Sequence, residues 1–193
     1  MSRREWYWYD VEIILVRHAE SVIPTPDGPD EHHRPLTETG HAQALRLVEE
    51  LAAIGPSLIA ASPYLRAVQT VEPLARALAL PVLTDHELRE WDSGLEPTPD
   101  YARHYERSWA DPDFARPGGE SLNQLTVRAV SILRSFTGTV VIGSHGTFVA
   151  RALAGLGIPV DWPFSQAMPM PAIYRIADTG ITGPGLEISP SRR

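Results

Sequence analysis

Short runs of branched apolar residues alternate along this chain with longer stretches in which apolar positions recur every three or four residues. The apolar runs are typical of buried β-strands and lie at 11–16, 58–61, 81–84, 139–143 and 172–177. The longer stretches have the period of helices and lie at 37–54, 62–78, 121–136 and 147–154. Strands that alternate with helices in this way predict a three-layer α/β/α sandwich with a mostly parallel central sheet.

Two of the predicted helices begin at recognisable capping residues. Thr37 can cap the first helix, because a threonine hydroxyl accepts from free backbone amides. The apolar residues that we then expect on one face are Leu45, Val48 and Ala52. At the start of the second helix, Ser62 is a similar cap, and Pro63 fits the first helical position.

The length and composition fit a single domain. A chain of 193 residues is long enough to bury a core, and no linker or internal repeat divides it. We expect one domain over residues 1–180. Residues 181–193 are rich in Gly, Pro and Ser and predict a poorly ordered tail. The aromatic run at 6–9 is expected to pack along an edge of the sheet.

The composition excludes several classes of function. All 17 Lys and Arg side chains are arginines, so a Walker A phosphate loop and a Schiff-base mechanism are excluded. The absence of cysteine excludes thiolate catalysis and a disulfide framework. A formal net charge of -7 argues against nucleic-acid binding. Because no signal peptide or membrane span is recognisable, a soluble cytoplasmic protein without a membrane partner is expected.

Basic residues follow three of the predicted strands. Arg17 and His18 come directly after the first strand. Arg66 lies one turn into the helix after the second strand, and His145 follows the strand at 139–143. Open α/β sheets hold their ligands at the carboxyl ends of strands, so we expect these groups to meet there. Guanidinium and imidazole groups suit an anionic substrate and a nitrogen nucleophile.

Six short motifs follow one another along most of the chain. They are RHAES (17–21), PLTETGHAQA (35–44), SPYLRAVQT (62–70), LREWDSG (88–94), GGES (118–121) and SHG (144–146). In residue types and order they resemble the motifs of the histidine phosphatase superfamily, also called the phosphoglycerate mutase-like family. The resemblance implies a phosphoglycerate mutase-like fold and the transfer of phosphoryl groups.

The resemblance also implies a role for each basic residue. His18 would attack phosphorus and carry the phosphoryl group as a phosphohistidine, for which the attacking nitrogen must be unprotonated. Nearby arginine charges would favour that neutral ring. Arg17, Arg66 and His145 would bind the phosphate and supply the positive charge that Mg²⁺ supplies in kinases, so neither a metal nor a cofactor is expected. Ser21 is expected to add a contact to the substrate.

Glu90, in the LREWDSG motif, matches the acid loop of the family. It would protonate the leaving alkoxide, and its neighbour Trp91 is expected to desolvate the carboxyl group. Asp92 and Glu87 are the competing carboxylates in this loop.

Glu120, in the GGES motif, is expected to support the residues that contact substrate without contacting it itself. Its alternative role is that of a carboxylate favoured by the dipole of the following helix.

Two positions depart from the family pattern. Ala19 follows the Arg-His pair where family members often have glycine, a small change that is expected to be tolerated. Pro24 stands where many members have an asparagine that contacts phosphate, and proline offers neither an N–H nor a polar side chain. The phosphate is therefore expected to lose one contact unless Thr25 or another residue compensates. His32 and His33 are expected to be surface histidines rather than metal ligands.

Together these residues favour a metal-independent phosphomonoesterase that acts on a small phosphorylated substrate. A phosphoglycerate mutase would use the same residues, although such mutases are commonly longer. A protein phosphohistidine phosphatase and an inactive phosphate-binding module are further alternatives. Specificity is expected from the loop at 24–34 and the segment at 92–117. In that segment, six side chains have two alternative roles: they reach a leaving group, or they form a solvated helix face. They are Tyr101, Arg103, His104, Arg107, Trp109 and Arg116.

Overall fold

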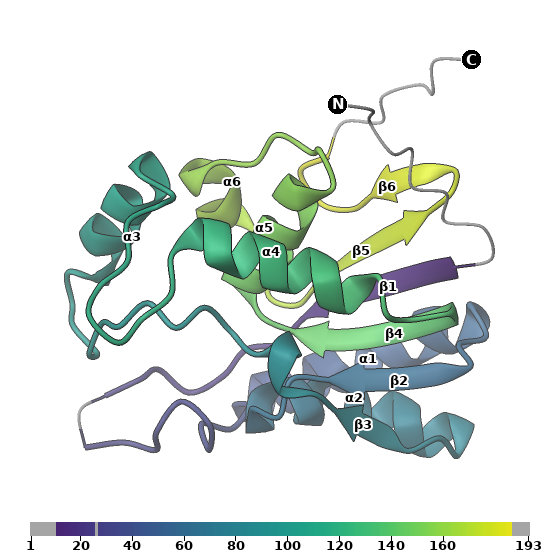
Figure 1. Cartoon of the computed structure of the whole chain (residues 1–193). Helices are drawn as coiled ribbons and strands as arrows, with labels where there is room; N and C mark the ends of the chain where they lie inside the picture. The colour runs from purple at the N-terminus through teal and green to yellow at the C-terminus, as the bar shows by residue number, and fades with distance from the viewer. Residues whose placement is uncertain (1–10, 26, 187–193) are drawn as a thin grey trace, which may run out of the picture.

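A six-stranded sheet lies between two layers of helices in the computed structural model, which describes residues 11–25 and 27–186 (Figure 1). The strands are β1 (Val11–Arg17), β2 (Leu58–Ala61), β3 (Val82–Thr84), β4 (Gly138–Ser144), β5 (Ala172–Ala177) and β6 (Gly180–Thr182). The α-helices are α1 (Glu38–Ala53), α2 (Leu65–Leu78), α3 (Tyr101–Ala110), α4 (Leu122–Leu133), α5 (Gly146–Gly155) and α6 (Trp162–Ala167). A 3₁₀ turn, η1 (His86–Leu88), follows β3.

The strand order across the sheet is β3-β2-β4-β1-β5-β6. The first four strands in that order pair in parallel, which confirms the predicted α/β/α architecture. Strand β5, however, pairs antiparallel with β1, and β6 antiparallel with β5, so one edge of the sheet departs from the parallel pattern. In the register of the central strands, Arg17 lies opposite Ser144 and Ala61 opposite Gly143. The carboxyl ends of β1, β2 and β4 therefore meet at one edge.

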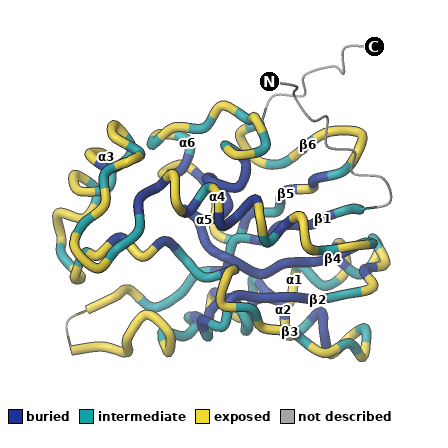
Figure 2. Tube along the Cα trace, in the orientation of Figure 1, coloured by how far each residue is buried: buried dark blue, intermediate teal, exposed yellow. Residues whose placement is uncertain are grey.

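The central strands are apolar on both faces because each face carries a helical layer. Ile13 and Leu15 of β1 pack with α4 and α5, whereas Ile14 and Val16 of the same strand pack with α1 and α2. Side chains of a strand alternate between its two faces, so one continuous apolar run serves both cores. Figure 2 shows β2 and β4 buried along most of their length, as this arrangement requires.

Helix α1 begins after Thr37 as predicted, but its predicted face is buried only in part, at Ala52, which packs against the core. The Thr37 hydroxyl accepts from the Gly40 N–H at 3.0 Å. Of the face expected from the sequence, Leu45 is 61% exposed, and the buried residues are Gly40, Ala44 and Leu51. Gly40 is required there because a Cβ would lie 2.0 Å from the carbonyl oxygen of Glu20. The close approach of the chain at Gly40 therefore sets which side of α1 faces the sheet.

The end of the folded chain lies further on than the sequence predicted. Ile181 and Thr182, expected in the tail, belong to β6, and Ile181 and Leu186 pack against the core beside α4 and α5. The apolar side chains explain the difference, because they anchor a segment that is otherwise rich in Gly and Pro. The rest of the predicted tail, 187–193, and the aromatic run at 6–9 lie outside the described residues. None of the described helices combines the length and apolar character needed to cross a bilayer.

Candidate active site

The four basic residues predicted at strand ends come together at the carboxyl edge of the sheet. The Nε of Arg66 lies 3.3 Å from the Nε2 of His18, and the ring centroids of His18 and His145 are 5.3 Å apart. Both rings and Arg66 are buried, with exposed fractions of 6% for His18, 1% for Arg66 and 0% for His145. The fourth basic residue, Arg17, is the last residue of β1.

The ring of His18 is held at both of its nitrogens. Its Nδ1 lies 2.7 Å from the carbonyl oxygen of Ala19, which can only accept, so Nδ1 carries the proton. Its unprotonated Nε2 accepts from Arg66 Nε at 3.3 Å. Burial, followed by the charge of Arg66, lowers the pKa of His18 from its ordinary value to about 3. The imidazole is therefore neutral at physiological pH, with its unprotonated nitrogen directed toward Arg66.

Arg66 is engaged on its outer side by Glu31. Its Nη1 donates to the Glu31 carbonyl oxygen at 2.6 Å, and its Nη2 donates to Glu31 Oε2 at 2.9 Å. Glu31 comes from the loop at 22–34, and its side chain is 46% exposed. The two terminal amino groups that were expected to bind phosphate therefore hold one backbone carbonyl and one carboxylate oxygen of Glu31 in this structure.

Arg34 is a further cation at the site, which the sequence analysis did not single out. Its Nη1 donates to Ser21 Oγ at 2.8 Å and to the Val22 carbonyl at 2.7 Å, and its Nη2 donates to Glu31 Oε2 at 3.1 Å. Its charge contributes to the lowered pKa values of His18 and of Arg66, so it lies within electrostatic reach of both. The signal in the sequence is its place directly before the PLTETGHAQA motif.

Three buried polar atoms at the site lack a hydrogen-bond partner among the described residues: Arg17 Nε, Arg34 Nε and His145 Nδ1. Buried donors are normally satisfied, and groups without a partner are a mark of sites that hold a ligand. Arg17 is held in place from its other end, since its Nη1 donates to the Met168 carbonyl. A Cβ on Gly146 would lie 3.1 Å from Arg17 Nε, so glycine leaves room for the guanidinium.

Ser62 orients His145 instead of capping α2. Helix α2 begins at Leu65, after Tyr64, without a side-chain cap, so the predicted role of Ser62 was wrong. Ser62 Oγ accepts from the Tyr64 N–H at 3.2 Å and lies 2.8 Å from His145 Nε2. When the hydroxyl donates to Nε2, the ring proton of His145 sits on Nδ1 and is available to an anion. Burial, followed by the charge of Arg66, holds the pKa of His145 well below its ordinary value.

Glu90 lies at the amino-terminal end of α5. Its Oε1 accepts from the N–H groups of Trp91 at 2.8 Å and Phe148 at 3.0 Å, and its Oε2 accepts from Thr147 at 3.3 Å. A helix amino terminus favours a negative charge, so this is a suitable position for a carboxylate. The Trp91 ring, expected to desolvate Glu90, contacts Tyr105 with centroids 4.9 Å apart and donates from Nε1 to the Glu120 carbonyl.

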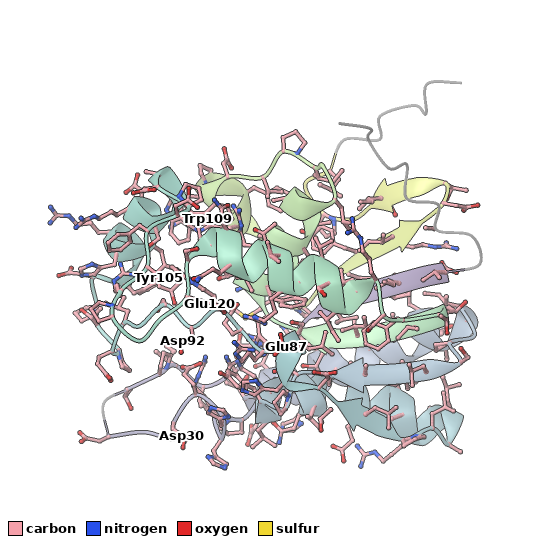
Figure 3. All side chains as sticks on the ribbon, in the orientation of Figure 1. Asp30, Glu87, Asp92, Tyr105, Trp109 and Glu120 are labelled. Carbon is pink, nitrogen blue, oxygen red and sulfur yellow. The ribbon has the colours of Figure 1, made fainter. Side chains whose placement is uncertain are left out.

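The competing carboxylates of this loop, Glu87 and Asp92, have other partners, and so does Glu120. Figure 3 labels these three side chains. Glu87 is paired with Arg89 at 3.4 Å and its side chain is 52% exposed. Asp92 Oδ1 accepts from the Gly94 N–H at 3.1 Å. Glu120 is paired with Arg128 of α4. Among these carboxylates, Glu90 is the one whose charge acts on both Arg17 and Arg66.

Ser21 and Thr25, the two further residues expected to contact substrate, have different surroundings. Ser21 Oγ accepts from Arg34. Thr25 is exposed, and its carbonyl accepts from the Gly28 N–H. His33 pairs with Asp30 at 2.9 Å, and His32 is exposed beside Tyr64. The described residues contain no group of three or more His, Asp or Glu placed to hold a metal ion.

The segment 92–117 forms α3 and the loops on either side of it. Arg103, His104 and Arg107 are exposed on α3 and line a surface cavity of about 270 Å³ with Asp100. Two aromatic residues of α3, Tyr105 and Trp109, lie toward the protein, whereas Tyr101 is 53% exposed. Tyr105 contacts Trp91, and Trp109 lies 6.4 Å from Trp162 between ring centroids. Arg116 donates to the Ser93 and His104 carbonyls, at 3.2 Å and 3.1 Å. Its side chain therefore holds the loops around α3 together.

Comparison with known proteins identifies the family of this chain. A family model of the histidine phosphatase superfamily, branch 1, matches residues 13–177. A probable phosphoglycerate mutase of Proteus mirabilis is 32% identical over 166 residues, 77% of this chain and 76% of that protein. Phosphoserine phosphatase 1 of Hydrogenobacter thermophilus is 32% identical over 178 residues, 80% of this chain and 81% of that protein.

A solved structure shows the same fold at lower identity. The mycobacterial glucosyl-3-phosphoglycerate phosphatase superposes with a TM-score of 0.68 at 22% identity, over 89% of this chain and 95% of that one. The family match and the relatives place the chain among phosphoryl-transfer enzymes. It belongs to branch 1 of the histidine phosphatase superfamily, as its motifs implied.

Proposed function

We propose that this chain is a phosphomonoesterase that hydrolyses small phosphate esters through a covalent phosphohistidine on His18. The observation that carries the proposal is the state of the His18 ring. Its Nδ1 is held by the Ala19 carbonyl at 2.7 Å, and its Nε2 faces the Arg66 guanidinium at 3.3 Å. This buried, neutral imidazole has its lone pair oriented by an arginine N–H, and it can attack the phosphorus of an anion that takes over that N–H.

The phosphate would be bound by the buried donors that have no protein partner. Arg17 Nε, Arg34 Nε and His145 Nδ1 would each donate to the anion, and Arg66 would add a further contact when Glu31 releases it. Arg34 supplies a charge that compensates for Pro24, which replaces the usual asparagine. Phosphoryl transfer spreads negative charge over the equatorial oxygens, so preorganised cations lower its barrier without a metal.

In the first step, His18 Nε2 forms a bond to phosphorus while the bond between phosphorus and the leaving oxygen breaks. Glu90 has to carry a proton for this step, although its three backbone N–H partners favour the carboxylate. It gives that proton to the leaving oxygen, and the alcohol leaves. In the second step, the Glu90 carboxylate takes a proton from water, the oxygen of that water bonds to phosphorus, and the bond to Nε2 breaks. Inorganic phosphate leaves, and both His18 and Glu90 return to their starting states.

The test is hydrolysis of 4-nitrophenyl phosphate in the presence of EDTA, with the parent protein and His18→Ala prepared in the same way. We expect turnover in the parent that survives the chelator and is lost in the variant. Quenched reactions of the parent should contain phosphohistidine, which ³¹P NMR identifies as a phosphoramidate. Turnover that stops with EDTA, or that persists in His18→Ala, would overturn the proposal.

Phosphoglycerate mutase activity is the second candidate, because a relative that matches 77% of the chain carries that description. The first step would be the same, but the phosphoryl group would pass to a second substrate oxygen instead of water. Incubation with 3-phosphoglycerate separates the two reactions. Release of inorganic phosphate supports the phosphatase, whereas appearance of the 2-phospho isomer without free phosphate supports the mutase.

A further inference from the structure

The loop that carries Glu90 is bound by one arginine of α4. Arg128 Nη1 donates to the carbonyl oxygens of Glu87 at 2.7 Å and Arg89 at 3.0 Å, and its Nη2 lies 3.4 Å from the Glu90 carbonyl. The side chain of Arg128 is only 7% exposed. One buried guanidinium therefore fixes three carbonyl groups in the four residues that end at Glu90.

Glu120 binds the same loop on the other side of Glu90. Its N–H donates to the Asp92 carbonyl at 2.8 Å, and its Oε1 accepts from the Asp92 N–H at 3.3 Å. Its carbonyl accepts from Trp91 Nε1 at 2.8 Å. The Glu120 carboxylate also pairs with Arg128, through both oxygens. The pair thus holds the backbone on both sides of Glu90.

We propose that Glu120 and Arg128 are positioning residues, which fix the Glu90 carboxyl at the distance needed for proton transfer to the leaving group. This inference rests on the proposed function, in which Glu90 is the general acid. A buried ion pair is a weak source of stability, because desolvation offsets its attraction. Here Arg128 and Glu120 form hydrogen bonds to the backbone of an irregular loop. The main effect of the pair is therefore on the position of that loop.

Arg151 provides a matched control. It is another buried arginine, 8% exposed, and it ties α5 to α4 through Thr126 Oγ1 at 2.8 Å and Asn123 Oδ1 at 3.1 Å. These hydrogen bonds go to α4 rather than to the Glu90 loop. A change at Arg151 therefore costs packing and hydrogen bonds in the same helical layer and leaves the Glu90 loop with all its partners.

The experiment compares kcat/KM for two esters that differ in their need for a general acid. 2,4-Dinitrophenolate leaves without a proton, whereas phenolate leaving from phenyl phosphate needs one. We expect Arg128→Met and Glu120→Gln to lower kcat/KM for phenyl phosphate on the order of 10- to 100-fold, part of a general acid's usual contribution. For 2,4-dinitrophenyl phosphate we expect a change of no more than about 3-fold, well below that contribution. Glu90→Gln should show the same selective loss, and Arg151→Met should show none.

Equal losses for both esters in Arg128→Met and Glu120→Gln would overturn the inference and leave the pair a purely structural role. So would an unchanged kcat/KM for both. If Arg128→Met does not fold, Glu120→Gln decides alone, since it keeps the shape and the acceptor oxygen. A parent protein that hydrolyses neither ester refutes the proposed function itself. A parent and Glu90→Gln that behave as expected, beside pair variants that do not, refute only the positioning role.

Discussion

Arg66 binds Glu31 through both of its terminal amino groups while its Nε faces His18 Nε2 at 3.3 Å. The residue that is expected to hold the phosphate is thus already holding an anion of the protein. A phosphate that binds Arg66 in a bidentate manner has to displace the Glu31 carboxylate. The observed affinity for phosphate is then lower than that of the open site, because part of the molecules have Arg66 bound to Glu31.

Replacing Glu31 by glutamine should therefore tighten the binding of inorganic phosphate. The Glu31 side chain is 46% exposed, so the expected gain is small, roughly 2- to 5-fold in the inhibition constant, the size of an exposed ion pair. Competitive inhibition of 4-nitrophenyl phosphate hydrolysis measures it. Asp30→Asn, in the same turn, is the control and should have no effect. Weaker binding in Glu31→Gln would mean that Glu31 arranges Arg66 for phosphate instead of competing with it.

The lowered pKa of His18 makes stability depend on pH. The folded ring has a pKa of about 3, and an unperturbed histidine titrates near 6.5. Between these values the unfolded chain binds a proton that the folded chain does not, so the free energy of unfolding decreases as pH falls from about 6.5 toward 3. His18→Asn, which keeps an N–H donor near Nδ1, removes this contribution. Chemical denaturation from pH 7 to 4 should show a smaller loss in this variant than in the parent.

The control for the pH dependence is His41→Asn, an exposed histidine on α1, which should follow the parent. NMR of the ring nitrogens gives an independent check. The His18 signals should keep the pattern of a neutral ring protonated at Nδ1 from pH 8 to 5. A titration of His18 near 6.5 would contradict the geometry given for the ring.

Arg34 is expected to bind phosphate, in place of the asparagine that Pro24 replaces. Arg34→Ala should lower kcat/KM for 4-nitrophenyl phosphate by roughly 10- to 100-fold, the worth of a charge-assisted hydrogen bond to a ligand. Arg46→Ala, which removes an exposed arginine from α1, should leave the rate unchanged. If Arg34→Ala loses less than about 2-fold, far below the worth of such a bond, Arg34 only holds the loop through Ser21 and Val22.

Gly146→Ala should weaken substrate binding without weakening the fold. The added Cβ would lie 3.1 Å from Arg17 Nε, so the guanidinium has to shift by a few tenths of an ångström. Alanine is a better helix former than glycine, and Gly146 is the first residue of α5. We expect a higher KM with a melting temperature equal to or above that of the parent. A higher KM accompanied by a lower melting temperature would point to a general disturbance of α5.

The sequence allowed the sheet and the basic cluster to be predicted for one physical reason. Buried parallel strands are continuous apolar runs, and the residues that follow them meet at the same edge of the sheet. Arg17, Arg66 and His145 could therefore be grouped before any contact was known. The antiparallel pairing of β5 could not be predicted, because the residues of a strand do not encode the direction of its neighbour.

The contacts made by Glu31 and Arg34 could not be predicted from the sequence either. Both lie in the loop at 22–34, where no period fixes the path of the backbone. Their pairing depends on how that loop folds back over α2, where the Leu65 N–H donates to the His32 carbonyl at 2.8 Å. The buried face of α1 was predicted only in part for a related reason, since the contact of Gly40 with Glu20 sets the orientation of the helix.

The candidate site draws its groups from β1, the loop after it, α2, the loop before α3 and the turn into α5. No short fragment of the chain contains them all, so the anion site exists only when the whole sheet is assembled. A bound phosphate therefore stabilises the entire fold, by about 2.7 kcal/mol when it is present at 100 times its dissociation constant. The melting temperature can therefore be used to screen for substrates, because an ester that binds the site raises it.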